Sequence, residues 1–394
     1  MPVANGRSYL AIPGPSVTPE AVIRAMSRAS PNIYTGELHE ITDTIIPDLK
    51  YVAGTNGDVG IYISNGHGMW EAALANVVSR GDKVLVLACG RFGIGWSAAA
   101  QALGLDVQIE DFGQESVVDP ERTREILAAD KEGAIKAVLI CHVDTSTSAK
   151  SDVAAIRKAI DAAGHDALFL VDCIASLGCD RFEMDNWGVD IMISASQKGL
   201  MTPAGVGLIW LNDKAKAARA RLNDVSPYWD WTLRINPAEF YQYFDGTAPT
   251  HHLYALRAAL DLIKAEGMEA IWERHETLVR AIWAAVDAWG QGGAMKLNMK
   301  NPSERSHAVT SIYLGGEDGD RLREWCETMC GVTLGIGLGR TPPSAYFRIG
   351  HMGHVNAHGI LGVLGVIDAG LKALDIPHGD GALAAAATVI SKTR

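Results

Sequence analysis

Short apolar runs alternate with helical stretches between Gly60 and Asn212, and this alternation limits the fold more than any other feature of the chain. The runs are apolar at successive positions, so both faces of each strand are expected to be buried. The stretches between them have helical spacing, as in Glu71–Val78, Ala98–Leu103 and Val153–Ala163. The predicted strands are Ile61–Ile63, Val84–Leu87, Val138–Ile140, Ala167–Val171, Asp190–Ile193 and Gly207–Trp210. The pattern predicts an α/β fold with a mostly parallel sheet that helices cover on both faces.

The 394 residues are enough for two domains. We expect an extended, Pro/Gly-rich N-terminal arm over residues 1–19, a large domain over 20–255 and a smaller C-terminal α+β domain over 256–394. A first helix is predicted from Pro19 to Ala29, and a long helical stretch from His252 to about Trp289. The predicted elements after it are a strand Val309–Leu314, a helix Asp320–Met329, an extended piece Ala345–Ile349 and a short tail helix within Gly381–Arg394.

The composition is that of an ordinary globular protein, and it argues against several classes of function. The net charge is −11 and there is no basic tract, which argues against nucleic-acid binding. We expect no membrane association, because no apolar run is long and charge-free enough to span a bilayer. Met1–Leu10 is polar and is not typical of a signal peptide. The six cysteines lie mostly in apolar runs, which favours free thiols and a cytoplasmic location.

Two predicted strands end in residues that carry chemistry. Ala167–Val171 leads into Asp172, and Asp190–Ile193 leads into Lys198. Ligand sites of α/β sheets lie at the carboxyl ends of the strands, so these two side chains are expected to share a site. A lysine that forms a Schiff base and a carboxylate that keeps a pyridine nitrogen protonated are what a pyridoxal 5'-phosphate (PLP) site requires. The alternative for the lysine alone is a solvated strand end.

Other loops at strand ends supply candidate ligand groups. Ser64–Gly68 separates a strand from a helix, and its small residues suit either a single phosphate or a plain tight turn. Phe92 follows the next strand and is either an aromatic that stacks on a planar cofactor or an ordinary core residue. The hydroxyls of Thr145–Ser148 suit a phosphate or a phenolic oxygen, with turn and N-cap roles as the alternative.

Arg348 lies between apolar neighbours in a short extended stretch and therefore needs an anionic partner. That partner is either a substrate carboxylate or an internal acid. Arg340 is a weaker second candidate of the same kind. The histidines at 351, 354 and 358 have no carboxylate close by in the sequence, and we interpret them as supporting or surface residues. No metal site is predicted.

Four segments together resemble the class V aminotransferases of PLP fold type I, in the alanine/serine–glyoxylate aminotransferase family. They are Gly66–Lys83, Val171–Gly178, Met184–Leu200 and Phe347–Gly353. The resemblance covers most of the chain. It implies a large PLP-binding domain with a mostly parallel seven-stranded sheet, followed by the smaller C-terminal domain.

The resemblance also implies roles for single residues around the cofactor. Asn65, Gly66 and His67 match the turn that holds the phosphate, and Gln197 matches a further phosphate contact. Phe92 matches the aromatic that stacks on the pyridine ring, and Thr145 matches the hydroxyl near the ring oxygen. Asp172 matches the carboxylate on the pyridine nitrogen, with Ser176 close behind it. Lys198 matches the Schiff-base lysine.

Two further matches concern the substrate and the partner subunit. Arg348 matches the arginine that binds the substrate carboxylate. Thr247 matches a threonine that reaches the phosphate of the neighbouring subunit, which implies a homodimer with shared active sites. The chain departs from the family at Phe244–Thr247, where Tyr-His-His-Thr is usual, and at Asn32-Ile33, where the family has Gly-His.

The resemblance implies a ping-pong transamination from a small amino acid to a small 2-oxo acid. Serine, alanine and aspartate are the candidate donors, and glyoxylate and pyruvate the candidate acceptors. Tyr34 and an arginine before Arg348, at position 340, are also similar to pyridoxamine–pyruvate aminotransferase. That enzyme and a PLP-dependent lyase on the same fold are the alternatives.

Overall fold

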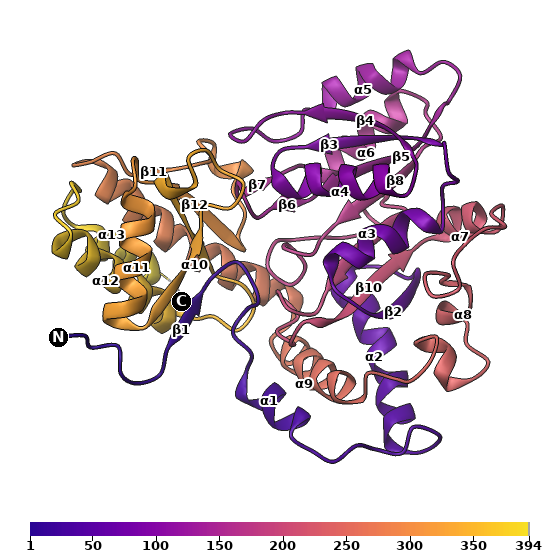
Figure 1. Cartoon of the computed structure of the whole chain (residues 1–394), viewed down its shortest axis with the longest axis horizontal. Helices are drawn as coiled ribbons and strands as arrows, with labels where there is room; N and C mark the ends of the chain where they lie inside the picture. The colour runs from indigo at the N-terminus through magenta and orange to yellow at the C-terminus, as the bar shows by residue number, and fades with distance from the viewer. Residues whose placement is uncertain (393–394) are drawn as a thin grey trace.

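The structure is a computed structural model that describes residues 1–392. A seven-stranded sheet forms the centre of the large domain, in the order β2-β10-β9-β8-β5-β3-β4 (Figure 1). Its strands are β2 (Asp58–Ser64), β3 (Lys83–Ala88), β4 (Asp106–Asp111), β5 (Ile135–Cys141), β8 (Leu168–Asp172), β9 (Ile191–Ala195) and β10 (Gly205–Leu211). Only β10 runs antiparallel to its neighbours, so the predicted α/β class and mostly parallel sheet are confirmed.

Both faces of this sheet are buried, as the apolar runs predicted. In β3, Leu85 and Leu87 belong to one core, and Val84 and Val86 belong to the core on the other face. The helices of the first core are α1 (Glu20–Met26), α2 (Glu37–Ala53), α5 (Pro120–Ala129), α6 (Val153–Ala162) and α9 (Thr250–Glu266). The second face is covered mainly by α3 (Gly66–Ala75) and α4 (Arg91–Ala102), with α7 (Asp213–Arg219) and α8 (Thr232–Ile235) at its side.

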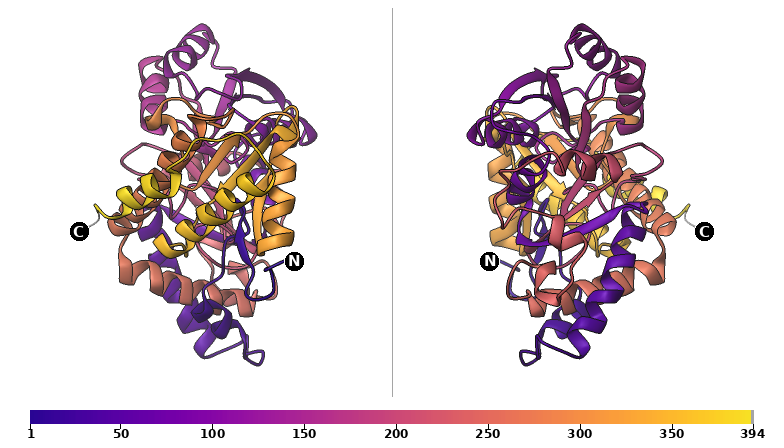
Figure 2. Two further views of the ribbon diagram at one scale, coloured as in Figure 1. Left: turned by 90° about the vertical axis from the view of Figure 1, so that its left-hand side faces the viewer. Right: turned by 90° about the vertical axis from the view of Figure 1, so that its right-hand side faces the viewer.

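A second, five-stranded sheet forms the small domain, in the order β1-β13-β14-β12-β11. Its strands are β1 (Tyr9–Ala11), β11 (Lys296–Leu297), β12 (Val309–Tyr313), β13 (Val332–Ile336) and β14 (Tyr346–Gly350). The helices α10 (Met268–Gly290), α11 (Asp318–Cys330), α12 (Ala357–Ala373) and α13 (Ala382–Ile390) pack with it. Figure 2 shows α11, α12 and α13 on the side that faces away from the large domain. A short hairpin of β6 (Val143–Asp144) and β7 (Ala149–Lys150) lies between the sheets.

The domain limits drawn from the sequence differ from the packing at two places. The expected boundary at residue 256 falls inside α9, whose buried residues belong to the large-domain core. That core extends to Ile271, and the small-domain core begins at Leu278, so we place the division within α10. The N-terminal arm is not wholly extended chain outside a domain, because its residues 9–11 form β1 and pair in parallel with β13.

Several smaller elements differ from their predictions. The helical stretch from His252 is two helices, because Gly267 has a φ of 83° and ends α9. The first helix ends at Met26 rather than Ala29. The tail helix is α13, and the last two residues of its predicted range lie outside the described chain. None of the described helices is long and apolar enough to cross a membrane.

Candidate active site

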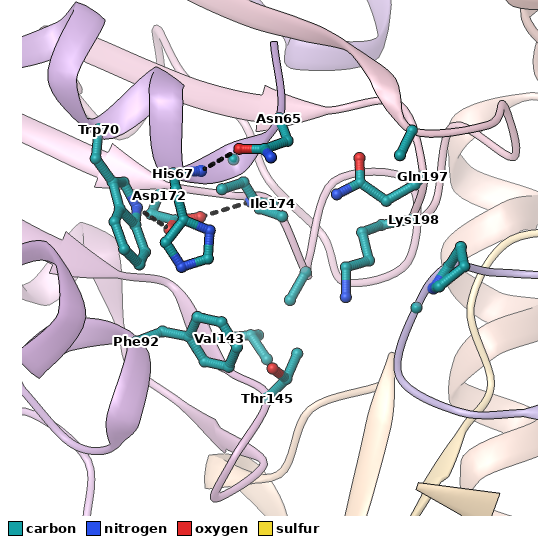
Figure 3. Close-up of a pocket in the computed structure, with 15 residues that line it drawn as sticks. Asn65, His67, Trp70, Phe92, Val143, Thr145, Asp172, Ile174, Gln197 and Lys198 are labelled. Atoms are coloured by element: carbon teal, nitrogen blue, oxygen red, sulfur yellow. Dashed lines mark hydrogen bonds between the residues drawn. The ribbon is translucent and has the colours of Figure 1, made fainter. Parts of the chain in front are cut away.

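A cavity of about 280 Å³ lies at the carboxyl ends of the large-sheet strands, beside the N-terminal arm (Figure 3). The loops after β2, β3, β5, β8 and β9 all contribute to it. Its lining residues are Gly14, Pro15, Asn65, Gly66, His67, Trp70, Phe92, Val143, Thr145, Asp172, Ile174, Ala175, Gln197, Lys198 and Ala204. Seven of the side chains that the sequence singled out for the cofactor are therefore in one place, together with Gly66.

Asp172 is the last residue of β8, and its carboxylate is held from two sides. Its Oδ1 accepts from the backbone N–H of Ile174 at 2.7 Å, and its Oδ2 accepts from the indole Nε1 of Trp70 at 2.7 Å (Figure 3). The residue is only 4% exposed. Burial raises the pKa of Asp172 to about 6, and these two donors hold it below the value that burial alone would give. The carboxylate is therefore ionised at neutral pH and faces the cavity.

Lys198 follows β9, and its side chain extends into the cavity from the opposite side (Figure 3). Its Nζ donates to the backbone oxygen of Pro13 in the N-terminal arm. Burial lowers the pKa of Lys198 to about 8, and the positive charge of Arg348 lowers it as well. An amine with this pKa is partly neutral near pH 7, which is the form that attacks a carbonyl.

The arm is tied to this lysine by its backbone. The N–H of Ser16 donates to the carbonyl of Gln197 at 2.9 Å, and its Oγ donates to the carbonyl of Lys198 at 2.7 Å. Gly14 has a φ of 101°, and a Cβ there would lie 2.2 Å from the Lys198 Nζ. Only glycine allows the arm to pass so close to the amine.

The N-terminus of α3 opens at one end of the cavity. Asn65 is its N-cap, and the amide oxygen of this side chain accepts from the N–H groups of His67 and Gly68. Gln197 lies opposite, and its Oε1 is buried without a hydrogen-bond partner in the described part of the chain. The N–H groups at a helix N-terminus favour an anionic group, and the side-chain NH₂ of Gln197 is a further donor for such a group.

Asp144 organises the third side of the cavity, although it does not line it. Its Oδ2 accepts from the N–H groups of Phe92 at 2.7 Å and Gly93 at 3.2 Å, at the start of α4. Its Oδ1 accepts from the N–H of Ser146 at 2.9 Å and from the Ser146 Oγ at 2.5 Å. This one buried carboxylate thus fixes Phe92 and the loop that carries Thr145.

The two arginines differ in where they lie. Arg348 in β14 donates from Nη1 to the carbonyl of Thr145 at 2.8 Å and from Nε to that of Ile336 at 2.7 Å. It makes no ion pair within residues 1–392, although the buried carboxylate of Asp144 acts on its charge, and it stands beside the cavity without lining it. Burial lowers the pKa of Arg348 to about 10. Arg340 instead donates to the carbonyl of Gln114 and to Oδ1 of Asn298, away from the cavity.

Besides the two arginines, three predicted site residues lie outside the cavity of this single chain. Ser176 is fully buried behind Asp172 and is not among the lining residues. Tyr34 is 81% exposed in the loop before α2, and Thr247 is exposed in the turn before α9. Of the hydroxyls in the predicted cluster, only that of Thr145 lines the cavity; the Ser146 hydroxyl serves the turn.

The histidines near the end of β14 do not gather around a common point. His351 is buried and bonded to Thr310 and to the carbonyl of His307, whereas His354 and His358 are exposed. Residues 1–392 contain no group of three His, Cys, Asp or Glu side chains placed to hold a metal ion. All six cysteines are free.

Residues 8–344 match the family model described as aminotransferase class-V. The chain belongs to the class-V aminotransferase family. It is 39% identical to a serine–glyoxylate aminotransferase of Methylorubrum extorquens, over 96% of this chain and 95% of that protein. It is 36% identical to an L-aspartate–glyoxylate aminotransferase of Paracoccus denitrificans, over 87% of this chain and 85% of that one.

Solved structures of aminotransferases share the whole fold. The ureidoglycine–glyoxylate aminotransferase of Bacillus subtilis superposes with a TM-score of 0.90 and 27% identity, over 99% of this chain and all of that one. The pyridoxamine–pyruvate aminotransferase of Mesorhizobium loti superposes with a TM-score of 0.88 at 23% identity, over 99% of each chain, which bears on the fold alone. The predicted PLP fold type I is confirmed, and the chain is an aminotransferase of a family that uses PLP.

Three parts of this class-V aminotransferase site have no assigned role in the sequence prediction. Trp70 lies within the segment that carries the family resemblance, but nothing in the sequence pairs its indole with Asp172. Asp144 accepts hydrogen bonds from the N–H groups of Phe92 and Gly93, which precede it by about fifty positions in the chain. The sequence predicts only an irregular segment around Gly14 and Pro15. The Pro-Gly-Pro run indicates a constrained backbone but not its contact with the cavity.

Proposed function

We propose that this class-V aminotransferase binds PLP through Lys198 and transfers an amino group from a small amino acid to a small 2-oxo acid. The observation that carries the proposal is the placement of Lys198 and Asp172 on opposite sides of one cavity. This cofactor requires an amine that loses its proton readily, as Lys198 does, and a carboxylate that is ionised at neutral pH, as Asp172 is.

The residues around the cavity fit the cofactor. The N-terminus of α3, with Asn65, Gly66 and His67, would hold the phosphate, and the side-chain NH₂ of Gln197 would donate to it. Phe92 would lie against the ring and Thr145 near its phenolic oxygen. When bound, PLP supplies an electron sink for the bonds at the substrate Cα.

The chain's own groups would then do three things. The Arg348 guanidinium would bind the substrate carboxylate, because it is held beside the cavity by the carbonyl of Thr145 and has no ion pair within residues 1–392. Lys198 would move a proton to and from the substrate Cα as a base with a pKa near neutral. Asp172 would keep the ring nitrogen protonated by remaining ionised beside it.

Borohydride reduction followed by peptide mapping tests the covalent link. We expect a single pyridoxyl adduct, on Lys198, in the wild-type protein. The Lys198→Ala variant should lose the adduct, the visible absorbance and turnover by about 10³-fold or more. Lys136→Ala, which changes a lysine at the opposite end of β5, is the matched control and should keep all three. An adduct on another lysine, or none, would refute the assignment.

The donor and acceptor are proposed from the relatives and from the charges beside the cavity. Serine, alanine and aspartate are the donors, and glyoxylate and pyruvate the acceptors, with the names of the relatives favouring glyoxylate. Each donor is to be mixed with the protein alone and the change in visible absorbance followed, which isolates the half-reaction. If no donor produces a change, while pyridoxamine and pyruvate are converted to pyridoxal and alanine, the alternative enzyme would be supported instead.

We further propose a cytoplasmic homodimer with shared active sites. Thr247 is exposed and outside the cavity of its own chain, as a residue that serves a neighbouring subunit would be. Light scattering gives the mass, and mixing Lys198→Ala with Thr247→Ala chains tests sharing. Mixed dimers would regain activity only if Thr247 acts across the interface.

A further inference from the structure

Trp70, in the middle of α3, makes a direct hydrogen bond to Asp172 in the candidate site. Its indole Nε1 donates to Oδ2 of Asp172 at 2.7 Å, and the residue is only 2% exposed. The ring is stacked on Trp96 with centroids 6.3 Å apart and an interplanar angle of 15°. A Cβ at Gly95 would lie 3.1 Å from the indole, so the absence of a side chain there leaves room for the ring. The orientation of the N–H is thus fixed by packing on α4.

An indole N–H can only donate, and it does not titrate in the range where proteins are stable. It therefore stabilises the ionised form of Asp172 without adding a formal charge to the cavity. The other strong donor, the N–H of Ile174, occupies Oδ1. Each carboxylate oxygen has one short hydrogen bond and retains acceptor capacity for a protonated ring nitrogen.

The other groups around Asp172 act on its charge in different directions. Asp144 is a like charge that raises the pKa of Asp172, and Lys198 is the cation that lowers it. The thiols of Cys141 and Cys173 flank it, and burial raises the pKa of each, so both are neutral. His67 lines the same cavity from α3. The Cys141 thiol is a weaker donor, at 3.8 Å from the same Oδ2. Within the described chain, the Trp70 indole is therefore the only short side-chain donor to the carboxylate, next to the Ile174 amide.

We propose that Trp70 is a positioning residue that keeps Asp172 ionised and aimed at the cofactor ring nitrogen. The proposal rests on the proposed function, because it assigns Trp70 a role toward the same bound ring. It is distinct from packing, since it depends on one N–H group rather than on the volume of the ring.

The test is the affinity of the cofactor-free protein for PLP as a function of pH, measured by equilibrium dialysis between pH 5 and 9. Binding should weaken on the acid side as Asp172 takes up a proton. In Trp70→Phe, the loss of the donor raises the pKa of Asp172, so the acid midpoint should rise by about one pH unit. Between pH 8 and pH 6 the affinity of the variant should fall about tenfold, against about twofold for wild type. Titration of the ligand itself is common to all proteins and cancels in the comparison.

Two variants control for packing. Trp96→Phe removes an equal volume from the stacked partner, whose Nε1 has no hydrogen-bond partner among the residues that the structure describes, and its midpoint should equal that of wild type. Trp70→His keeps a ring N–H at the position of the indole nitrogen, so its midpoint should lie at or below that of wild type. If Trp70→Phe does not fold, the comparison of Trp70→His with wild type still tests whether a ring N–H at this position is sufficient.

The outcomes separate this inference from the function on which it rests. If wild type binds no PLP at any pH, the proposed function fails. If wild type binds, and Trp70→Phe weakens binding equally at every pH or matches Trp96→Phe, only the role of Trp70 is refuted. A rise of the midpoint in Trp70→His as well would also refute it.

Discussion

Replacing Asp144 by asparagine should destabilise the large domain far more than its conservative character suggests. The carboxylate accepts four hydrogen bonds, two on each oxygen, from Phe92, Gly93 and Ser146. An amide keeps one oxygen and turns an NH₂ group toward two of these donors. Each lost bond to a charged acceptor is worth about 1.5–3 kcal/mol, so the loss is about 3 kcal/mol at the lower limit. Removing the anion from the α4 N-terminus adds up to about 1 kcal/mol.

Urea unfolding followed by circular dichroism measures this loss. With a slope of about 3 kcal/mol per M, the midpoint should fall by about 1 M. Asp119→Asn is the matched control, because Asp119 caps α5 from the surface through a single bond to the N–H of Glu121. Asparagine is as good an N-cap as aspartate, so that midpoint should stay within about 0.2 M of wild type. Equal midpoints for the two variants would refute the organising role of Asp144.

The remaining predictions concern the lysine and the two arginines. PLP capture by the cofactor-free protein needs the neutral amine of Lys198, so its rate should rise about tenfold per pH unit and level off above about pH 8. Arg348→Gln removes a positive charge that lowers this pKa, so the plateau should move to higher pH in stopped-flow absorbance; an unmoved plateau contradicts the coupling. Arg340→Lys should cost about 2 kcal/mol of stability through its lost bonds to Gln114 and Asn298. Its KM for the amino donor should change less than twofold, and a tenfold rise would place Arg340 at the substrate.

The large sheet could be predicted because its inner strands are buried on both faces and so have long apolar runs. The edge strand β4 lacks this signal, since its sequence Asp106–Asp111 is polar at alternate positions and half exposed. The helix α12 was missed for another reason. It contains four glycines, each of which lowers helix propensity, and packing of its apolar face against the small sheet stabilises it instead.

The candidate site divides in the same way. Lys198 and Asp172 could be located because strand ends in an α/β sheet meet at one edge. The contacts of Trp70 and Asp144 depend on how α3 and α4 pack against the sheet. The residues next to them in the sequence do not indicate this packing. Arg340 shows how little the local sequence says about an arginine's partners. Its sequence context makes it a weaker candidate than Arg348 for an anion partner, and in the structure its two Nη atoms donate to the carbonyl of Gln114 and to the side-chain amide oxygen of Asn298.

The pairing of β1 with β13 has a consequence for biosynthesis. Tyr9–Ala11 leave the ribosome long before Val332–Leu334, their partners in β13, have been synthesised. The large domain can fold before that point, because its core ends near Ile271. We therefore expect Pro13 and Gly14 to settle over Lys198 in one of the last steps of folding. Until then we expect the amine of Lys198 to remain accessible on that side to the proposed PLP cofactor.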